Sequence, residues 1–203
     1  MVHSEVSVIN EQDKILHVHF NAETKRSAPQ GYCVQELLKR SHIQTLTVVE
    51  RRNSFDRVGD FDERLASAHY YLHWIMIAAE GQAIGYLAEP LGKYRLRTGS
   101  LMGNLTRLSE DYVQICDILL HEKQFAFRHG EEAAAIIRDR LFVAQRDLAY
   151  LDRTQGRSES AKRRLTNMIK ERPREFELYV DLLKAYVPAS LLPKLRTLKS
   201  HGL

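Results

Sequence analysis

The sequence predicts an α/β layer followed by an all-α helical tail, with helix as the main secondary structure overall. Over residues 1–100, short β-branched or alternating apolar runs are interspersed with segments of helical periodicity. Over residues 101–203, helical periodicity continues alone. The predicted strands are too few for a complete doubly wound domain, so we expect an incomplete sheet.

Four segments are predicted to be strands. Residues 6–9 and 15–20 are apolar or alternating runs, and the polar residues 10–14 between them indicate a hairpin. The β-branched run at 46–49 predicts a third strand, and residues 83–87 predict a fourth. Pro90 and Gly92 are expected to interrupt the chain before residues 94–97.

The remaining periodic segments predict helices. In the first hundred residues the predicted helices cover residues 34–40 and 67–80, the second ending at Gly81. In the tail they cover residues 105–127, 131–154, 158 to just before Pro173, and 176–187, with a break at Gly130 and with Pro188 and Pro193 around a last turn. Gly156, Ala161 and Pro173 have the spacing of a tetratricopeptide repeat, which predicts one such hairpin at about 131–173. A single repeat cannot bury its own face, so the hairpin must pack on neighbouring helices.

Charge and cysteine content limit the class of protein. No stretch approaches the ~20 apolar residues that span a bilayer, and the first residues lack a secretory pattern. Two distant cysteines, Cys33 and Cys116, favour free thiols and therefore a cytoplasmic location. The chain has a net charge of +4, and its positive excess lies in residues 157–203, which hold eleven basic and five acidic side chains. This basic tail leaves attachment to a membrane surface open, but its interspersed acids favour a solvated helix face, and no nucleic-acid partner is expected.

One region resembles a known family. The residues Val58-Gly59-Asp60-Phe61-Asp62-Glu63 resemble the Val-Gly-Gly-Phe-Asp-Glu loop of family 2 glycosyltransferases. Matching residues precede and follow this loop without gaps, from Leu37-Leu38 through Arg51-Arg52 and Phe55 to Gly85-Tyr86, Tyr94-Arg95 and Ser100. The resemblance covers about half of the chain.

The resemblance implies the acceptor-side, C-terminal half of an inverting transferase of the GT-A fold. The nucleotide-binding half, with its Asp-X-Asp motif, would then be absent from this chain. No cofactor is expected here, because a divalent metal would belong to that half. The predicted arrangement is residues 1–100 as the acceptor-side part and residues 101–203 as the helical tail.

Inverting transfer needs a general base for the acceptor hydroxyl. The family's acidic pair corresponds to His69 and Tyr70, which are therefore the candidate catalytic residues. Tyrosine, with an ordinary pKa of ~10, is a poor base at neutral pH, whereas imidazole titrates near neutrality. The candidate substrate-binding residues are Asp60, Phe61, Asp62, Trp74, Arg95 and Arg97.

Several of these residues also have structural interpretations. Asp62 could instead cap the next helix, and Trp74 could be a core anchor. Arg97 stands where the family often has His and cannot bind a metal, although it could pair with a phosphate. His69 and His73 have the spacing of two metal ligands on a helix, but no third ligand is evident, so no metal site is predicted.

Two functions remain open. The first is nucleotide-sugar transfer to a glycan, lipid or protein acceptor by a split or truncated enzyme that is inactive alone and pairs with a nucleotide-binding half. The second is a non-catalytic protein–protein interaction module built on a degenerate transferase. An incomplete sheet would expose apolar edges, which predicts self-association or another protein partner.

Overall fold

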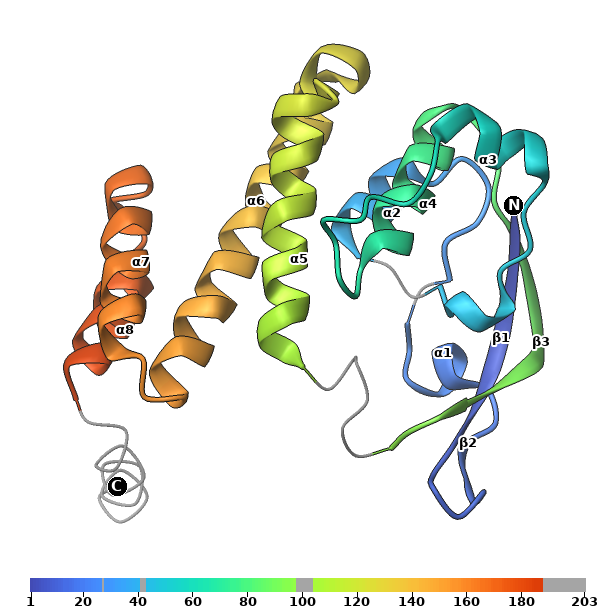
Figure 1. The fold of residues 1–203 in the computed structure, drawn as a ribbon, viewed down its shortest axis with the longest axis horizontal. Helices are drawn as coiled ribbons and strands as arrows, with labels where there is room; N and C mark the ends of the chain where they lie inside the picture. Colours follow the sequence, from blue (N-terminus) through green and yellow to red (C-terminus); the bar gives the residue numbers. More distant parts are fainter. Residues whose placement is uncertain (27, 41–42, 98–103, 188–203) are drawn as a thin grey trace. The chain divides into compact units, whose positions relative to one another are not determined.

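The computed structural model describes residues 1–26, 28–40, 43–97 and 104–187, and it combines a small mixed sheet with many helices (Figure 1). The coarse prediction of an α/β part followed by helices is confirmed. The chain divides into two compact units, Met1–Arg140 and Leu141–Leu203. This division falls inside a helix, whereas the predicted boundary at residues 100 and 101 lies outside the described residues.

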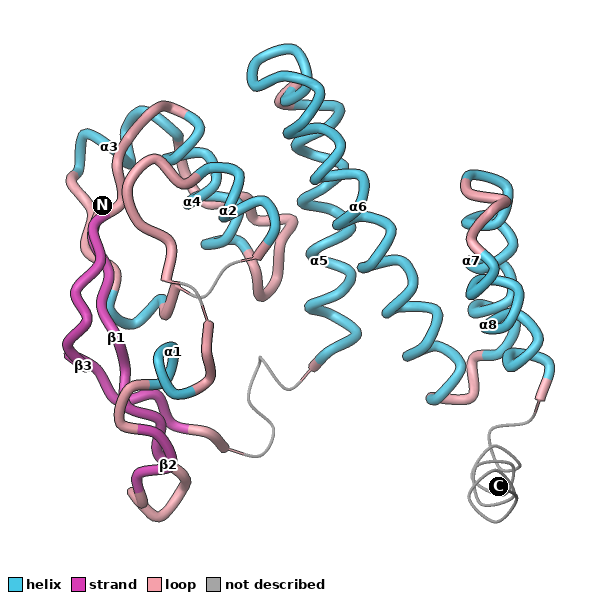
Figure 2. The backbone as a smooth tube through the Cα atoms, turned by 180° about the vertical axis from the view of Figure 1, so that it is seen from behind, coloured by secondary structure: helices cyan, strands magenta, loops and turns pink. Residues whose placement is uncertain are grey.

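The strands of the first unit are β1 (Val2–Ile9), β2 (Ile15–His17) and β3 (Gly85–Arg95). In the described part of the chain they form one sheet in the order β2-β1-β3, coloured magenta in Figure 2. β1 and β2 are antiparallel, which confirms the predicted hairpin, whereas β1 and β3 are parallel.

The central strand β1 carries a fully buried carboxylate, that of Glu5. Its oxygens accept hydrogen bonds from the backbone amides of Val6 (2.9 Å) and Asn21 (3.0 and 3.1 Å) and from the hydroxyl of Tyr86 (3.2 Å). A buried charge is tolerated when several donors surround it. Glu5 therefore joins β1 to β3 and to the start of the short helix α1 (Phe20–Glu23).

β3 is longer than predicted, because Pro90 and Gly92 lie within it. The register between β1 and β3 shifts on either side of Glu5, which pairs with Pro90, and such bulges accommodate a proline in a strand. A Cβ at Gly92 would lie 2.3 Å from the Leu46 Cδ1 atom, so a larger residue there would require the exposed Leu46 side chain to move. The predicted interruption of the strand at these residues is therefore wrong.

The predicted strand at 46–49 is also wrong. Its residues contribute to the 3-10 helix η1 (Thr45–Thr47), and only Val49 pairs with a strand, through an isolated bridge to Val2. The hydroxyl of Thr47 accepts from the Ser4 amide at 3.1 Å and lies 2.9 Å from the Gln44 carbonyl. A threonine side chain that bonds to the backbone in this way competes with a strand ladder.

The other helices largely follow the prediction. Those of the first unit are α2 (Val34–Lys39), α3 (Arg52–Val58), α4 (His69–Ala79), α5 (Leu105–Asp117), the π-helix η3 (Ile118–Glu122) and the first part of α6 (Phe125–Thr154). The helix predicted at 105–127 ends early, because a π-helical turn follows Asp117 and Gln124 has a φ of 48°. The break predicted at Gly130 is present, with a φ of 85° inside α6.

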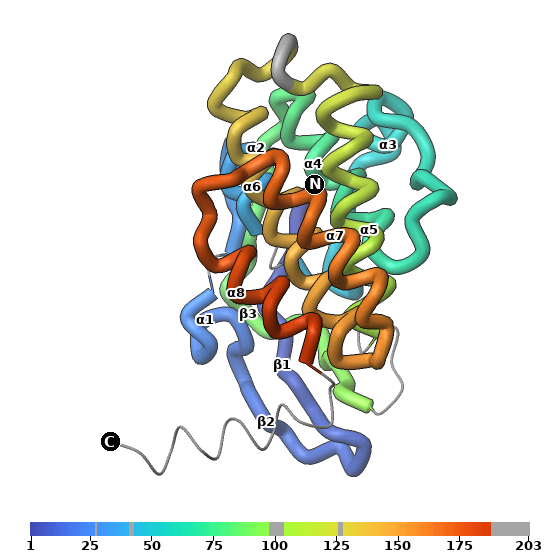
Figure 3. Tube along the Cα trace, turned by 90° about the vertical axis from the view of Figure 1, so that its left-hand side faces the viewer, coloured from blue at the N-terminus to red at the C-terminus, as the bar shows by residue number. Residues whose placement is uncertain are grey.

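In the second unit, the later part of α6 is followed by α7 (Ser158–Glu171) and α8 (Phe176–Tyr186). α7 and α8 run side by side in Figures 1 and 3. Gly156 makes the turn before α7 with a φ of 80°, and Ala161 is fully buried, as the repeat-like spacing predicted. The core consists of Ala149, Ala161, Leu165, Met168, Leu178 and Ala185. Pro188 and Pro193 lie outside the described residues.

A second buried carboxylate, that of Asp111 on α5, caps α4. It accepts hydrogen bonds from the Ser67 amide (2.6 Å), the Ser67 hydroxyl (2.8 Å) and the Ala68 amide (2.8 Å). The N-cap residue of α4 is Ala68, whose methyl group cannot accept a hydrogen bond. The suggestion that Asp62 caps this helix is therefore corrected, because the cap comes from a helix more than forty residues later.

The pKa of Asp111 reflects this arrangement. Burial alone would raise the pKa of its carboxyl, but hydrogen bonds from Ser67, Ala66 and Ala68 outweigh it, and the pKa lies below its usual value. A carboxyl whose folded-state pKa is depressed stabilises the fold above its unfolded pKa of about 3.9, and loses that contribution as pH falls through the folded pKa.

We expect Asp111→Ala to lower the free energy of unfolding by about 2–3 kcal/mol, because buried amides at the start of α4 lose their acceptor. Urea unfolding at pH 7 measures this change. Asp117→Ala, on the exposed side of the same helix, is the matched control and should change it by less than about 0.5 kcal/mol. The free energy of unfolding of the Asp111→Asn variant should also fall less at acid pH than that of the native protein. Equal unfolding of the Asp111→Ala and Asp117→Ala variants would contradict the capping role.

Candidate functional site

A small cavity in the first unit collects half of the residues that the family resemblance singled out. Its volume is about 120 Å³. The end of α3 and the loop after it, α4 and the residue after η3 contribute the lining residues, which are Val58, Asp60, Phe61, Asp62, His69, Leu72, His73, Met76 and Lys123. The structure thus brings the candidates Asp60, Phe61, Asp62 and His69 together.

Phe61 forms an aromatic wall of this cavity. Its ring is 43% exposed and contacts Phe55, His69 and His73, with centroid distances of 5.7, 5.3 and 4.8 Å. The loop turns at Gly59, whose φ of 86° suits glycine. The three ring contacts therefore leave part of the Phe61 side chain exposed.

The two aspartates of the loop differ in what they bind. Asp62 accepts hydrogen bonds from the Arg64 guanidinium at 2.6 and 2.9 Å, and these bonds lower the pKa of its carboxyl. Arg64 also pairs with Glu122 at 2.7 Å, which ties the loop to η3. Among the described residues, Asp60 has no ion-pair partner. Asp62 therefore shapes the loop, whereas the Asp60 carboxylate lines the cavity.

His73 is held rigidly at the inner side of the cavity. Its Nε2 atom lies 3.1 Å from the Glu50 carboxylate, and its ring contacts Phe55 at 5.1 Å. Glu50 and Lys123 were not singled out from the sequence, because only the fold brings the Glu50 carboxylate to His73 and Lys123 to the cavity. His73 had been noted only for its spacing from His69, and it lies on the same helix one turn later.

The ring centroids of the two candidate catalytic residues lie 5.4 Å apart, but the other surroundings of the two rings differ. His69, the first residue of α4, lines the cavity. Tyr70 packs on Trp74 with a centroid distance of 4.9 Å, and burial raises the pKa of its hydroxyl to about 12. A phenol with that pKa is protonated at neutral pH, so Tyr70 is not suited to accept a proton.

Three other candidates lie elsewhere. Trp74 is 2% exposed, so it is a core residue and has no free face for a sugar. Arg95 lies beside Ile9 in the sheet and pairs with Asp13 at 2.6 Å. Arg97 lines a shallow hollow at the same hairpin turn. The parallel register carries the end of β3 to this turn, so the two arginines meet the hairpin and not the cavity.

Over the described ranges, no group of three or more His, Cys, Asp or Glu side chains gathers in a way that could hold a metal ion. None of the helices within those ranges is both long and apolar enough to cross a bilayer. Cys33 and Cys116 are both buried as free thiols, and burial raises the pKa of Cys116 to about 12. Both are therefore packing residues.

Comparison of the chain with protein-family models, curated proteins and solved structures finds no match.

We expect Glu50→Ala to reduce the free energy of unfolding by about 1–2 kcal/mol, since the buried Nε2 atom of His73 loses its partner. In NMR spectra of the histidine rings, His73 should shift more than His69. Glu63→Ala, which removes an exposed carboxylate from the same region, serves as the control and should stay within about 0.5 kcal/mol. An unchanged His73 spectrum would show that Glu50 does not hold the ring.

Proposed function

We propose that this protein provides the acceptor side of a family 2 glycosyltransferase-like enzyme, and that the cavity beside His69 receives a hydroxyl group of a carbohydrate acceptor. The observation that carries the proposal is the convergence of Asp60, Phe61 and His69 on one cavity. These residues come from two separate blocks of the motif resemblance, the loop and the helix after it.

The cavity offers the groups that such a reaction needs on the acceptor side. The Asp60 carboxylate would accept hydrogen bonds from sugar hydroxyls, and the Phe61 ring would pack against the sugar. His69 would take the proton of the attacking hydroxyl as its oxygen bonds to the anomeric carbon and the nucleoside diphosphate leaves. Lys123 adds a positive charge to the same lining.

The size of the cavity favours an acceptor over a donor. Pockets for whole small-molecule ligands typically measure about 300–1,000 Å³, whereas this one measures about 120 Å³. It suits one end of a sugar rather than a nucleotide-sugar. We therefore propose that donor binding and any divalent metal belong to a nucleotide-binding partner.

The full-length protein should bind an acceptor glycan from a panel screened by saturation-transfer NMR. His69→Ala and Asp60→Ala should each weaken that binding about tenfold, or about 1.4 kcal/mol, because each removes one polar contact. Glu63→Ala is the control and should bind as the native protein does. Titration of nucleotide-sugars with Mn²⁺ should give no saturable heat.

Two results would contradict the proposal. Glycan binding that is insensitive to both cavity variants would place the acceptor elsewhere. Saturable micromolar binding of a nucleotide-sugar would show that the chain carries its own donor site.

A second candidate function, a protein-interaction module, rests on an exposed apolar row along α8. Phe176, Leu183 and Tyr186 are 75, 70 and 65% exposed, and Tyr179 lies on the same side of the helix at helical spacing. Exposed aromatic rows of this kind mark protein interfaces.

If the α8 row is such an interface between copies of this chain, sedimentation should show concentration-dependent self-association, and Leu183→Glu should abolish it. Lys170→Glu, an exposed change on α7, controls for the added charge. A native protein that sediments as a monomer at all concentrations would remove the support for a self-interaction.

A further inference from the structure

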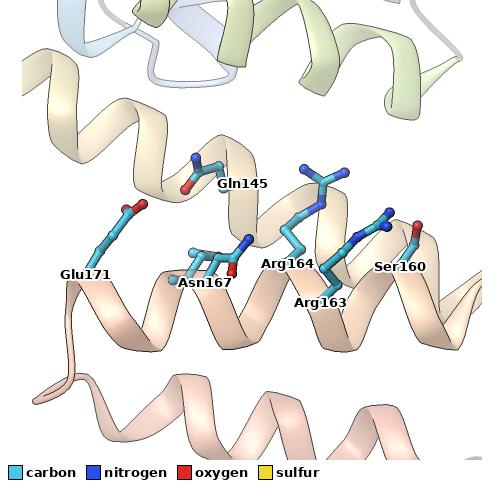
Figure 4. A pocket seen from close by; sticks show the side chains of 7 residues that line it. Gln145, Ser160, Arg163, Arg164, Asn167 and Glu171 are labelled. Carbon is cyan, nitrogen blue, oxygen red and sulfur yellow. The ribbon is translucent and has the colours of Figure 1, made fainter.

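The second unit contains a polar groove that takes no part in the proposed transfer. It lies between the later part of α6 and α7 and has a volume of about 250 Å³. Figure 4 shows its side chains in a row along α7, with Gln145 of α6 beside them. The residues that line the groove are Gln145, Ser160, Arg163, Arg164, Asn167, Met168 and Glu171.

One end of the groove has an excess of positive charge. Arg157 and Arg164 share a single buried carboxylate, that of Asp152, at 2.7 and 3.5 Å. The Nε–H of Arg164 is itself buried and lacks a hydrogen-bond acceptor among the described residues. Two guanidinium groups on one carboxylate leave one positive charge at this end of the groove.

Arg163 adds a second unbalanced charge. Within the described chain its guanidinium has no ion-pair partner, whereas the neighbouring Lys162 is neutralised by Glu159 at 2.8 Å. Ser160 lies in the first turn of α7, where the helix dipole also favours an anion. The groove therefore presents two guanidinium groups and a hydroxyl at this end, together with the amide of Asn167.

The opposite end of the groove is acidic. Glu171 lies seven residues beyond Arg164 in the same helix, which is about 10 Å along the axis. Its carboxylate is too distant to neutralise the arginines, and it would repel an extended anionic surface. The charge pattern fits one compact anion at the arginine end, carried by a molecule whose neutral or donor groups face Glu171.

We propose that this groove binds the phosphate group of a small soluble ligand. A phosphate monoester carries about 1.5 to 2 negative charges and three acceptor oxygens at neutral pH, which matches two unbalanced guanidinium groups and their neighbouring donors better than a carboxylate does. The fork of N–H groups on arginine binds such oxygens in pairs.

The test uses the full-length chain in a phosphate-free buffer, titrated with inorganic phosphate and with glucose 6-phosphate by calorimetry. Both should bind saturably, and Arg163→Gln should weaken binding roughly tenfold through loss of a charge-assisted pair. Arg163→Lys, which keeps the charge but not the fork, should recover only part of it. Arg174→Gln removes an exposed arginine outside the groove and should stay within about twofold.

The outcomes separate the possible sources of binding. Absence of saturable binding by both phosphates at millimolar concentration overturns the proposal. An equal loss with Arg174→Gln also overturns it, because the effect would be general charge attraction. Binding to vesicles containing phosphatidic acid but not to the soluble phosphates would show that the groove binds a membrane lipid and not a soluble ligand. Arg163 is exposed, so its variants should fold, and Asn167→Ala gives a second, uncharged variant of the site.

Discussion

The Asp111 carboxylate joins the core of the first unit to its candidate site. The side chain of Ala68 cannot cap α4, and the Asp111 carboxylate of α5 accepts hydrogen bonds from the amides of Ser67 and Ala68, which directly precede that helix. The first turn of α4 carries His69 and the next turn carries His73, so Asp111 holds the chain directly before the two imidazoles that line the cavity. The opposite face of α4 sends Tyr71 into the packing between α2, α5 and the first part of α6. One helix therefore serves the core and the cavity together.

Glu5 has a comparable part in the sheet. A strand with a charged side chain at its centre is unexpected from hydrophobic patterning, yet Glu5 is fully buried. Its oxygens accept from β1 itself, from the start of α1 and from Tyr86 on β3. Burying a carboxylate without hydrogen-bond donors would cost far more free energy than burying a neutral group, so the fold depends on the donors around Glu5. In both places a carboxylate orders backbone amides from a distant segment.

The candidate site was only partly predictable. Asp60, Phe61, Asp62 and His69 were recognised because they belong to short contiguous motifs, and the fold brings them to one cavity. Tyr70 and Trp74 belong to the same stretch, but the helical rotation of about 100° per residue directs them away from it. Glu50 and Lys123 had no local signal, since their proximity to His73 and Phe61 arises from packing alone.

Local pattern by itself determined the hairpin, the helices after Gly130 and the turns at Gly81, Gly130 and Gly156, because periodicity and backbone freedom are properties of neighbouring residues. Tertiary structure decided where those signals were overridden. The Thr47 hydroxyl replaced a strand ladder by side-chain bonds, and a bulge carried β3 through Pro90. Tertiary structure also decided the partners of the buried carboxylates. Asp111 reaches the Ser67 amide and Asp152 reaches the Arg164 guanidinium only because packing brings together elements that are separate in the sequence.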